Sequence, residues 1–155
     1  MSIDRLLTGL NPLISLVLRS PLHGLLSSGL ALITVYGRRT GRRYAIPVGY
    51  QQDGDRLTIL VSEARRKQWW RNYRAPGPIG VLLRGAAREG RAEVIAPLSD
   101  EFAATARATL SRLPSLGRVF GIPDYDRNVG VTPAQLDRLR TEIAAVRVTL
   151  DPLAG

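Results

Sequence analysis

Residues 30–62 read LALITVYGRRTGRRYAIPVGYQQDGDRLTILVS, three strand-like runs joined by two turns. The run at 30–36 is apolar and partly β-branched, the run at 43–51 follows a glycine-containing turn, and the run at 56–61 places alternate apolar residues on one face. Asp53-Gly54, between the second and third runs, is a strong hairpin signal. Because no crossover helix separates these runs, they predict antiparallel pairing and not a parallel nucleotide-binding sheet.

The rest of the chain extends this pattern with further strands and helices. Three more runs are strand-like: 79–84, 87–96 and 144–150. Three segments have helical spacing: 64–74, 101–112 with Ser99 or Asp100 as N-cap, and 133–140, which Thr132-Pro133 starts. Six short strands in hairpin order predict an α+β, mainly β, fold: a small antiparallel barrel with an N-terminal helical segment at 1–29 and inserted helices, forming one domain over 1–155.

Composition narrows the possible functions. The chain has 155 residues, 45% hydrophobic and 23% charged, as in a soluble globular domain. It has no cysteine and one histidine, His23, which excludes disulfides and thiol catalysis and argues against a multi-histidine metal site. The apolar run 6–18 is shorter than the roughly 20 residues that span a bilayer. We therefore expect a cytoplasmic protein whose N-terminal helix packs on the domain, with membrane-surface association as the alternative.

The positive charge is concentrated in one part of the chain. Ten of the 22 Lys and Arg residues lie between positions 38 and 74, with only three acids among them, so this segment carries +7 of the net charge of +9. The charge falls in two clusters, 37–43 and 65–67, each at an element boundary. Two guanidinium-rich corners at the ends of short strands suit a ligand with several negative charges. Compact charge and the absence of a nucleic-acid-binding motif argue against nucleic acid as the partner.

The two clusters offer different groups to an anion. The turn at 37–43 combines arginines, a threonine hydroxyl and glycine-freed backbone amides, the parts of a phosphate or carboxylate cradle; a solvated basic hairpin tip is the alternative interpretation. In the second cluster Ser62 could cap a helix starting at Ala64, which would carry 65–67 on its first turn. Trp69 and Tyr73 share a face of that helix and are expected to pack in the core, with Asn72 nearer the ligand.

No paired carboxylates and no nucleophile–base pair are visible, so an enzyme of this sequence would take its reactive group from a cofactor. The runs GRRTGRRYAIPVGYQQDGDRL and KQWWRN resemble the deazaflavin (coenzyme F420)-dependent nitroreductase family, split β-barrel oxidoreductases related to pyridoxamine-phosphate oxidase. The likeness covers residues 11–96. It implies a six-stranded split β-barrel, coenzyme F420 as cofactor, and hydride transfer to an acceptor such as a quinone, enone or nitro compound.

The resemblance also implies roles for individual residues. The basic turn would hold the cofactor's charged tail, the second strand would lie against the deazaflavin ring, and the loop after the third strand would contact the phosphate. The residues so implied are Arg38, Arg39, Thr40, Gly41 and Arg43 in the turn, Pro47 and Val48 in the strand, and Ser62, Arg65, Arg66, Lys67 and Asn72 in and after the loop. Tyr44 stands where relatives often carry a basic residue, and Tyr125 is the one C-terminal tyrosine that could lie near substrate.

Two alternatives accompany this reading. FMN also carries a phosphate and occupies the same kind of barrel elsewhere. A non-enzymatic basic module would instead bind nucleic acid or an anionic membrane. For quaternary structure, the sequence leaves open a homodimer through apolar contacts of Val81, Leu83, Val94 and Ile95, or a monomer in which the N-terminal helix covers that face.

Overall fold

The computed structural model describes residues 30–37 and 39–153, and the strands in this part of the chain form one antiparallel sheet. The strands are β1 (Leu30–Tyr36), β2 (Arg43–Gly49), β3 (Gln51–Asp53), β4 (Arg56–Val61), β5 (Gly77–Leu83), β6 (Ala86–Ile95) and β7 (Ala144–Leu150). The helices are the 3-10 helix η1 (Trp69–Tyr73), α4 (Asp100–Arg112), α5 (Leu116–Val119) and α6 (Pro133–Glu142). The N-terminal helix predicted within 1–29 lies outside the described residues.

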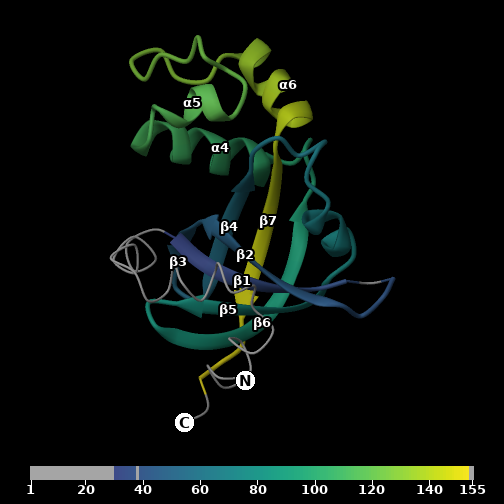
Figure 1. Cartoon of the computed structure of the whole chain (residues 1–155). Coiled ribbons are helices and arrows are strands. Elements are labelled where there is room, and N and C mark those ends of the chain that lie inside the picture. Colours follow the sequence, from purple (N-terminus) through teal and green to yellow (C-terminus); the bar gives the residue numbers. More distant parts are fainter. Residues whose placement is uncertain (1–29, 38, 154–155) are drawn as a thin grey trace.

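The sheet curls into a half-barrel because its two edge strands are consecutive in the chain. The strand order is β2-β1-β5-β6-β7-β4-β3, so β2 and β3 lie at opposite edges although only Tyr50 separates them in sequence. Figure 1 shows the sheet bending round to bring these edges together. The prediction of six strands was wrong at this point: the run 43–51 is broken at Tyr50, where the chain stops pairing with β1 and begins pairing with β4.

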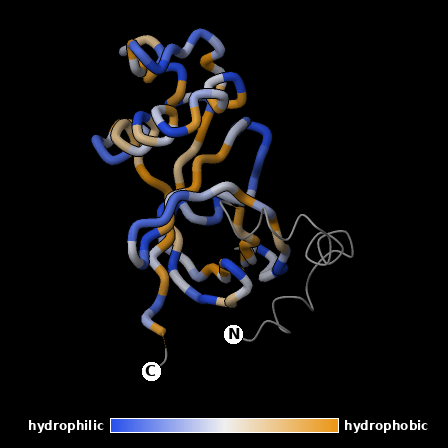
Figure 2. The backbone as a smooth tube through the Cα atoms, turned by 90° about the vertical axis from the view of Figure 1, so that its left-hand side faces the viewer, coloured by the Kyte–Doolittle hydropathy of each residue, from blue (hydrophilic) through white to orange (hydrophobic). Residues whose placement is uncertain are grey.

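Two hydrophobic clusters share the sheet. The inner faces of the strands, including Ile33, Val81 and Val146, fill the half-barrel. The outer face of β4, β7 and β6 packs against α4 and α6, with Phe102 and Leu139 fully buried between them. In Figure 2 hydrophobic stretches run along the strands that join the half-barrel to the helical lobe, whereas the outer loops of that lobe are mainly hydrophilic.

Local capping explains why the two long helices begin where they do. The Ser99 side chain accepts a hydrogen bond of 3.1 Å from the Phe102 backbone N–H at the start of α4, which confirms Ser99 as the N-cap. Thr132 and Gln135 form a reciprocal capping box at the start of α6, with Pro133 at the first helical position.

The helix predicted over 64–74 is wrong for most of its length. Residues 64–66 form a turn, and only Trp69–Tyr73 is helical, as a 3-10 helix. Glu63 adopts a left-handed φ of 51°, and its carbonyl accepts backbone hydrogen bonds from Arg66 and Lys67, which closes the turn. Because no helix starts at Ala64, Ser62 does not act as its N-cap. The aromatic part of the prediction is confirmed: Trp69 and Tyr73 are both buried, with their rings edge to face at 6.4 Å.

The residues predicted to form a dimer contact are wrong, because three of the four are buried within the chain's own core. Val81, Leu83 and Ile95 are 0%, 6% and 3% exposed, and Val94 packs against the half-barrel core. Side chains alternate across a strand, so Val81, Leu83 and Val94 face the inside of the half-barrel, while Ile95 lies under the helical lobe.

None of the described helices is long and apolar enough to cross a membrane.

Candidate functional site

A pocket of about 450 Å³ opens between β2 and β4, where the curled sheet brings its two edges together. Small-molecule sites commonly measure about 300–1,000 Å³, so this pocket is large enough for a flat aromatic ring system. The loop after β4 and the start of η1 complete its wall. The lining residues are Tyr44, Ile46, Pro47, Val48, Gly49, Ile59, Leu60, Val61, Ser62, Lys67, Gln68 and Trp69.

The backbone of β2 gives the pocket a polar edge beside apolar walls. In the described sheet β2 pairs only with β1, so its other edge carries N–H and C=O groups that no strand satisfies. Pro47 has no N–H to offer there. Ile46, Val61 and Trp69 supply apolar surface on the surrounding walls. An aromatic ligand with heteroatoms on its rim could therefore stack on the walls and hydrogen-bond along the strand edge.

One cation is held in the pocket wall. The Lys67 Nζ donates a hydrogen bond of 3.1 Å to Ser62 Oγ, and both side chains line the pocket. The left-handed turn at Glu63 folds the loop back so that residues five apart meet. Lys67 is only partly exposed, so its charge is screened less by solvent than that of a surface lysine. The pair can therefore present an ammonium group and a hydroxyl to an anion.

Tyr44 is a pocket residue that the sequence marked only as a departure from relatives. Its hydroxyl accepts a hydrogen bond of 3.4 Å from Asn72 Nδ2, which also donates to the Trp69 carbonyl at 3.0 Å. Asn72 thus links η1 to β2 from behind the pocket. Burial raises the pKa of the Tyr44 hydroxyl, an effect that the hydrogen bond from Asn72 partly opposes. The hydroxyl is therefore neutral and available as a donor at physiological pH.

The predicted site residues fall into two groups. Pro47, Val48, Ser62 and Lys67 line the pocket, with Asn72 immediately behind it. Arg39, Thr40, Gly41 and Arg43 lie in or beside the exposed 37–42 turn and do not line it, and Arg38 lies outside the described residues. The turn is closed by its own backbone, with hydrogen bonds from Gly41 to Gly37 and from Gly37 to Arg42.

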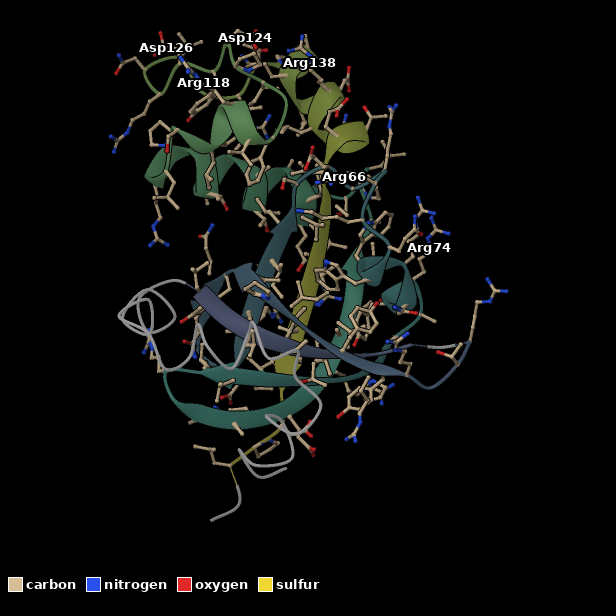
Figure 3. The ribbon with its side chains drawn as sticks, viewed as in Figure 1. Arg66, Arg74, Arg118, Asp124, Asp126 and Arg138 are labelled. Carbon is tan, nitrogen blue, oxygen red and sulfur yellow. The ribbon has the colours of Figure 1, made fainter. Side chains whose placement is uncertain are left out.

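The remaining basic residues lie around η1. Arg65 and Arg66 are exposed, and Arg66 pairs with Glu63 at 2.5 Å. Arg71 and Arg74 both lie against the Trp70 ring, with guanidinium carbons 5.5 and 5.4 Å from its centroid. Figure 3 shows Arg66 and Arg74 on the same side of the half-barrel, well away from Arg118 in the helical lobe. The spacing of Arg74 four residues after Trp70 predicts their proximity, whereas the contact of Arg71 with the same ring depends on the 3-10 geometry of η1.

Tyr125 is not brought to the pocket. It lies between α5 and α6 and packs against the core of the helical lobe. The Tyr125 side chain packs closely against Gly117: a Cβ added to Gly117 would lie only 3.0 Å from the Tyr125 Cβ. Within the described residues, no cluster of His, Cys, Asp and Glu could hold a metal ion.

Comparison with known proteins adds a family match and a set of structural neighbours. Residues 21–115, more than half of the chain, match the family model for F420H(2)-dependent quinone reductase. No curated protein matches the chain.

Three solved structures share the fold at low sequence identity. An F420-H2-dependent reductase is 13% identical with a TM-score of 0.55, covering 79% of this chain and 95% of that one. The heme storage protein HutZ of Vibrio cholerae is 10% identical with a TM-score of 0.54, covering 86% and 90%. A protein described as a domain-swapped dimer is 13% identical with a TM-score of 0.55, covering 88% and 92%.

Proposed function

Because the chain belongs to the F420H(2)-dependent quinone reductase family of oxidoreductases, we propose that it binds coenzyme F420 in the pocket between β2 and β4. The reaction we propose is reduction of an electrophilic organic acceptor such as a quinone, enone or nitro compound. The observation that carries this proposal is the pocket itself, which combines apolar walls, an open strand edge and the Lys67–Ser62 pair. The coenzyme, when bound in its reduced form, supplies the hydride.

The residues present fit such a group. A flat deazaflavin ring needs apolar walls and hydrogen-bond partners on its rim, and Ile46, Val61 and Trp69 with the edge of β2 offer both. The phosphate needs a cation, and Lys67 is the Lys or Arg side chain that lines the pocket within the described residues. The fit supports Pro47 and Val48 beside the ring and Ser62 and Lys67 at the phosphate, as the resemblance implies.

The exposed arginines have a different role in this proposal. Arg39 and Arg43 belong to the first basic cluster, and Arg65 and Arg66 to the second; all four are exposed, and none lines the pocket. We assign them to attraction and loose contact of the anionic tail, which stays in solvent where charged groups are weakly ordered. Their effect on binding should therefore depend more on ionic strength than the effect of Lys67.

The protein's contribution to the reaction is binding, orientation and exclusion of water. The apolar walls hold a ring against the edge of β2, and the Asn72–Tyr44 contact fixes the neutral tyrosine hydroxyl in the same pocket. Within the described residues no acid–base pair of the kind used in hydrolysis lines this pocket. The pocket's apolar walls, open strand edge and Lys67–Ser62 pair favour binding of a redox cofactor that carries the chemistry itself.

The direct test is a fluorescence titration of the full chain with coenzyme F420. We expect saturable binding, followed by oxidation of the reduced coenzyme when a simple quinone such as menadione is added. Protein that gives no binding response with the coenzyme would refute the proposal. FMN serves as the comparison ligand: yellow protein on purification, or tighter binding of FMN than of coenzyme F420, would favour a flavin enzyme instead.

A further inference from the structure

A second apolar surface lies on the outside of β2, β1 and β5. Cross-strand partners project on the same side of a sheet, so Leu32 stands beside Leu82, and Thr34 beside Gly80. These residues alternate with inward-facing core residues such as Ile33, and they therefore point away from the half-barrel core. We call this surface the β1–β5 outer face; its members on β1 and β5 are Leu32, Thr34, Gly80 and Leu82.

This face is buried, although no described element packs on it. Leu32, Thr34 and Leu82 are only 2%, 6% and 8% exposed. Leu32 and Leu82 belong to neither hydrophobic cluster of the described residues, and the helical lobe packs on β4, β6 and β7 instead. The Thr34 hydroxyl is also buried, and no residue in the described part of the chain gives it a hydrogen-bond partner. Such a face requires a covering segment.

We propose that residues 1–29 of the same chain pack on the β1–β5 outer face. This segment leads directly into β1, which begins at Leu30, so it is joined to the face it would cover. Its 29 residues include only three charged side chains, Asp4, Arg5 and Arg19, and helical spacing places Leu6 with Leu10 and Leu13 with Val17. Gly80 has no side chain, which allows a covering backbone to come close.

If residues 1–29 left the β1–β5 outer face, that face would be the surface through which two chains could associate. Leu32 and Leu82 would then be exposed together on a sheet surface, a form of apolar patch that commonly drives self-association. The occupant could in principle be a second copy of the chain or a membrane surface. The apolar composition of residues 1–29 and their direct link to β1 favour the chain's own segment, and the following experiment separates the three.

The test uses thiol reactivity in the full chain, because the protein has no cysteine of its own. A Thr34→Cys variant should react with a maleimide on the order of 100-fold more slowly than an exposed Thr149→Cys variant, because a local opening must precede reaction. The rate should not depend on protein concentration. A Val146→Cys variant, with its side chain in the half-barrel core, reports global unfolding.

Disturbing the proposed contact should expose the thiol. Adding Leu13→Glu to Thr34→Cys should speed its labelling about tenfold or more while the Val146→Cys background stays protected. Ser15→Glu, two positions away on the opposite side of a helix, is the matched control and should change little. If Leu13→Glu unfolds the protein, the Leu13→Cys, Thr34→Cys double variant decides instead: oxidation should give an intramolecular crosslink, with less in the matched Ser15→Cys, Thr34→Cys variant.

Three results would overturn the proposal. Labelling of Thr34→Cys that slows as protein concentration rises, or a crosslink that joins two chains, would assign the face to a second copy. Fast labelling in solution that becomes slow on adding vesicles of anionic phospholipid would assign it to a membrane surface. Fast labelling under every condition would show that nothing covers the face. Each readout is independent of cofactor binding, so failure here would leave the proposed function standing.

Discussion

Replacing Lys67 by Gln should weaken coenzyme F420 binding more than any other single loss of charge around the pocket. The Lys67 Nζ lies in the pocket wall, held 3.1 Å from Ser62 Oγ, and Gln keeps a hydrogen-bonding group there without the charge. Hydrogen bonds to charged groups contribute about 1.5–3 kcal/mol. At about 1.4 kcal/mol for each factor of ten, the dissociation constant should rise about 10- to 150-fold.

Arg66→Gln is the control that uses the same change of charge outside the pocket. The Arg66 side chain is 73% exposed and already paired with Glu63 at 2.5 Å, so its charge is both screened and partly neutralised. Exposed charges of this kind contribute about 0–1 kcal/mol, which predicts a rise of less than about fivefold in the dissociation constant. Arg118→Gln removes one charge in the helical lobe, which lies away from Arg66 and Arg74 in Figure 3. It should leave the dissociation constant of the coenzyme nearly unchanged.

The assay is fluorescence titration of the three variants and the unmodified chain at low and high salt. The Lys67 effect should persist at high salt, whereas any Arg66 effect should shrink, because salt screens exposed charges more than partly buried ones. Equal losses for Lys67→Gln and Arg66→Gln would refute the assignment of Lys67 to direct contact. A comparable loss for Arg118→Gln would show that overall charge, and not the pocket, governs binding.

Three further outcomes follow from contacts elsewhere. Gly90→Ala should destabilise the protein by about 1–3 kcal/mol in chemical denaturation, because an added Cβ would lie 2.4 Å from the Thr149 carbonyl oxygen; a loss below about 0.5 kcal/mol, the range of ordinary surface changes, would contradict that close approach. Tyr73→Phe should cost about 1–3 kcal/mol, because it removes the donor of the 2.9 Å hydrogen bond to the Pro78 carbonyl and leaves the acceptor unpaired; unchanged denaturation would mean that water replaces the donor. Burial raises the pKa of Tyr44, so its contribution to stability should be present below the ordinary tyrosine pKa and disappear as pH rises through the raised value. Alkaline absorbance titration of the unmodified chain against Tyr44→Phe measures this, and a Tyr44 signal that titrates below ordinary tyrosine would contradict it.

The sequence by itself determined the features that depend on near neighbours. The apolar, partly β-branched run at 30–36 predicted β1, and alternation predicted β4 and β7, each to within a residue. Asp53-Gly54 marked the hairpin between β3 and β4. Ser99 and Thr132 marked the starts of α4 and α6 because a cap needs only residues within one turn. The concentration of charge at 38–74 and the family resemblance were also readable without a structure. These signals are local, and the fold agrees with them.

Tertiary structure decided what depends on residues far apart in the chain. Tyr50 divides one predicted strand because its two halves pair with β1 and β4, partners that no local pattern names. Residues 64–74 have helical spacing, yet burying Trp69 and Tyr73 in the half-barrel and turning the chain at Glu63 leave only a short 3-10 helix. The same turn brings Lys67 to Ser62, and curling of the sheet brings both to β2 with Tyr44. The pocket forms from segments that meet only when the sheet closes, so its membership could not be read from any one of them.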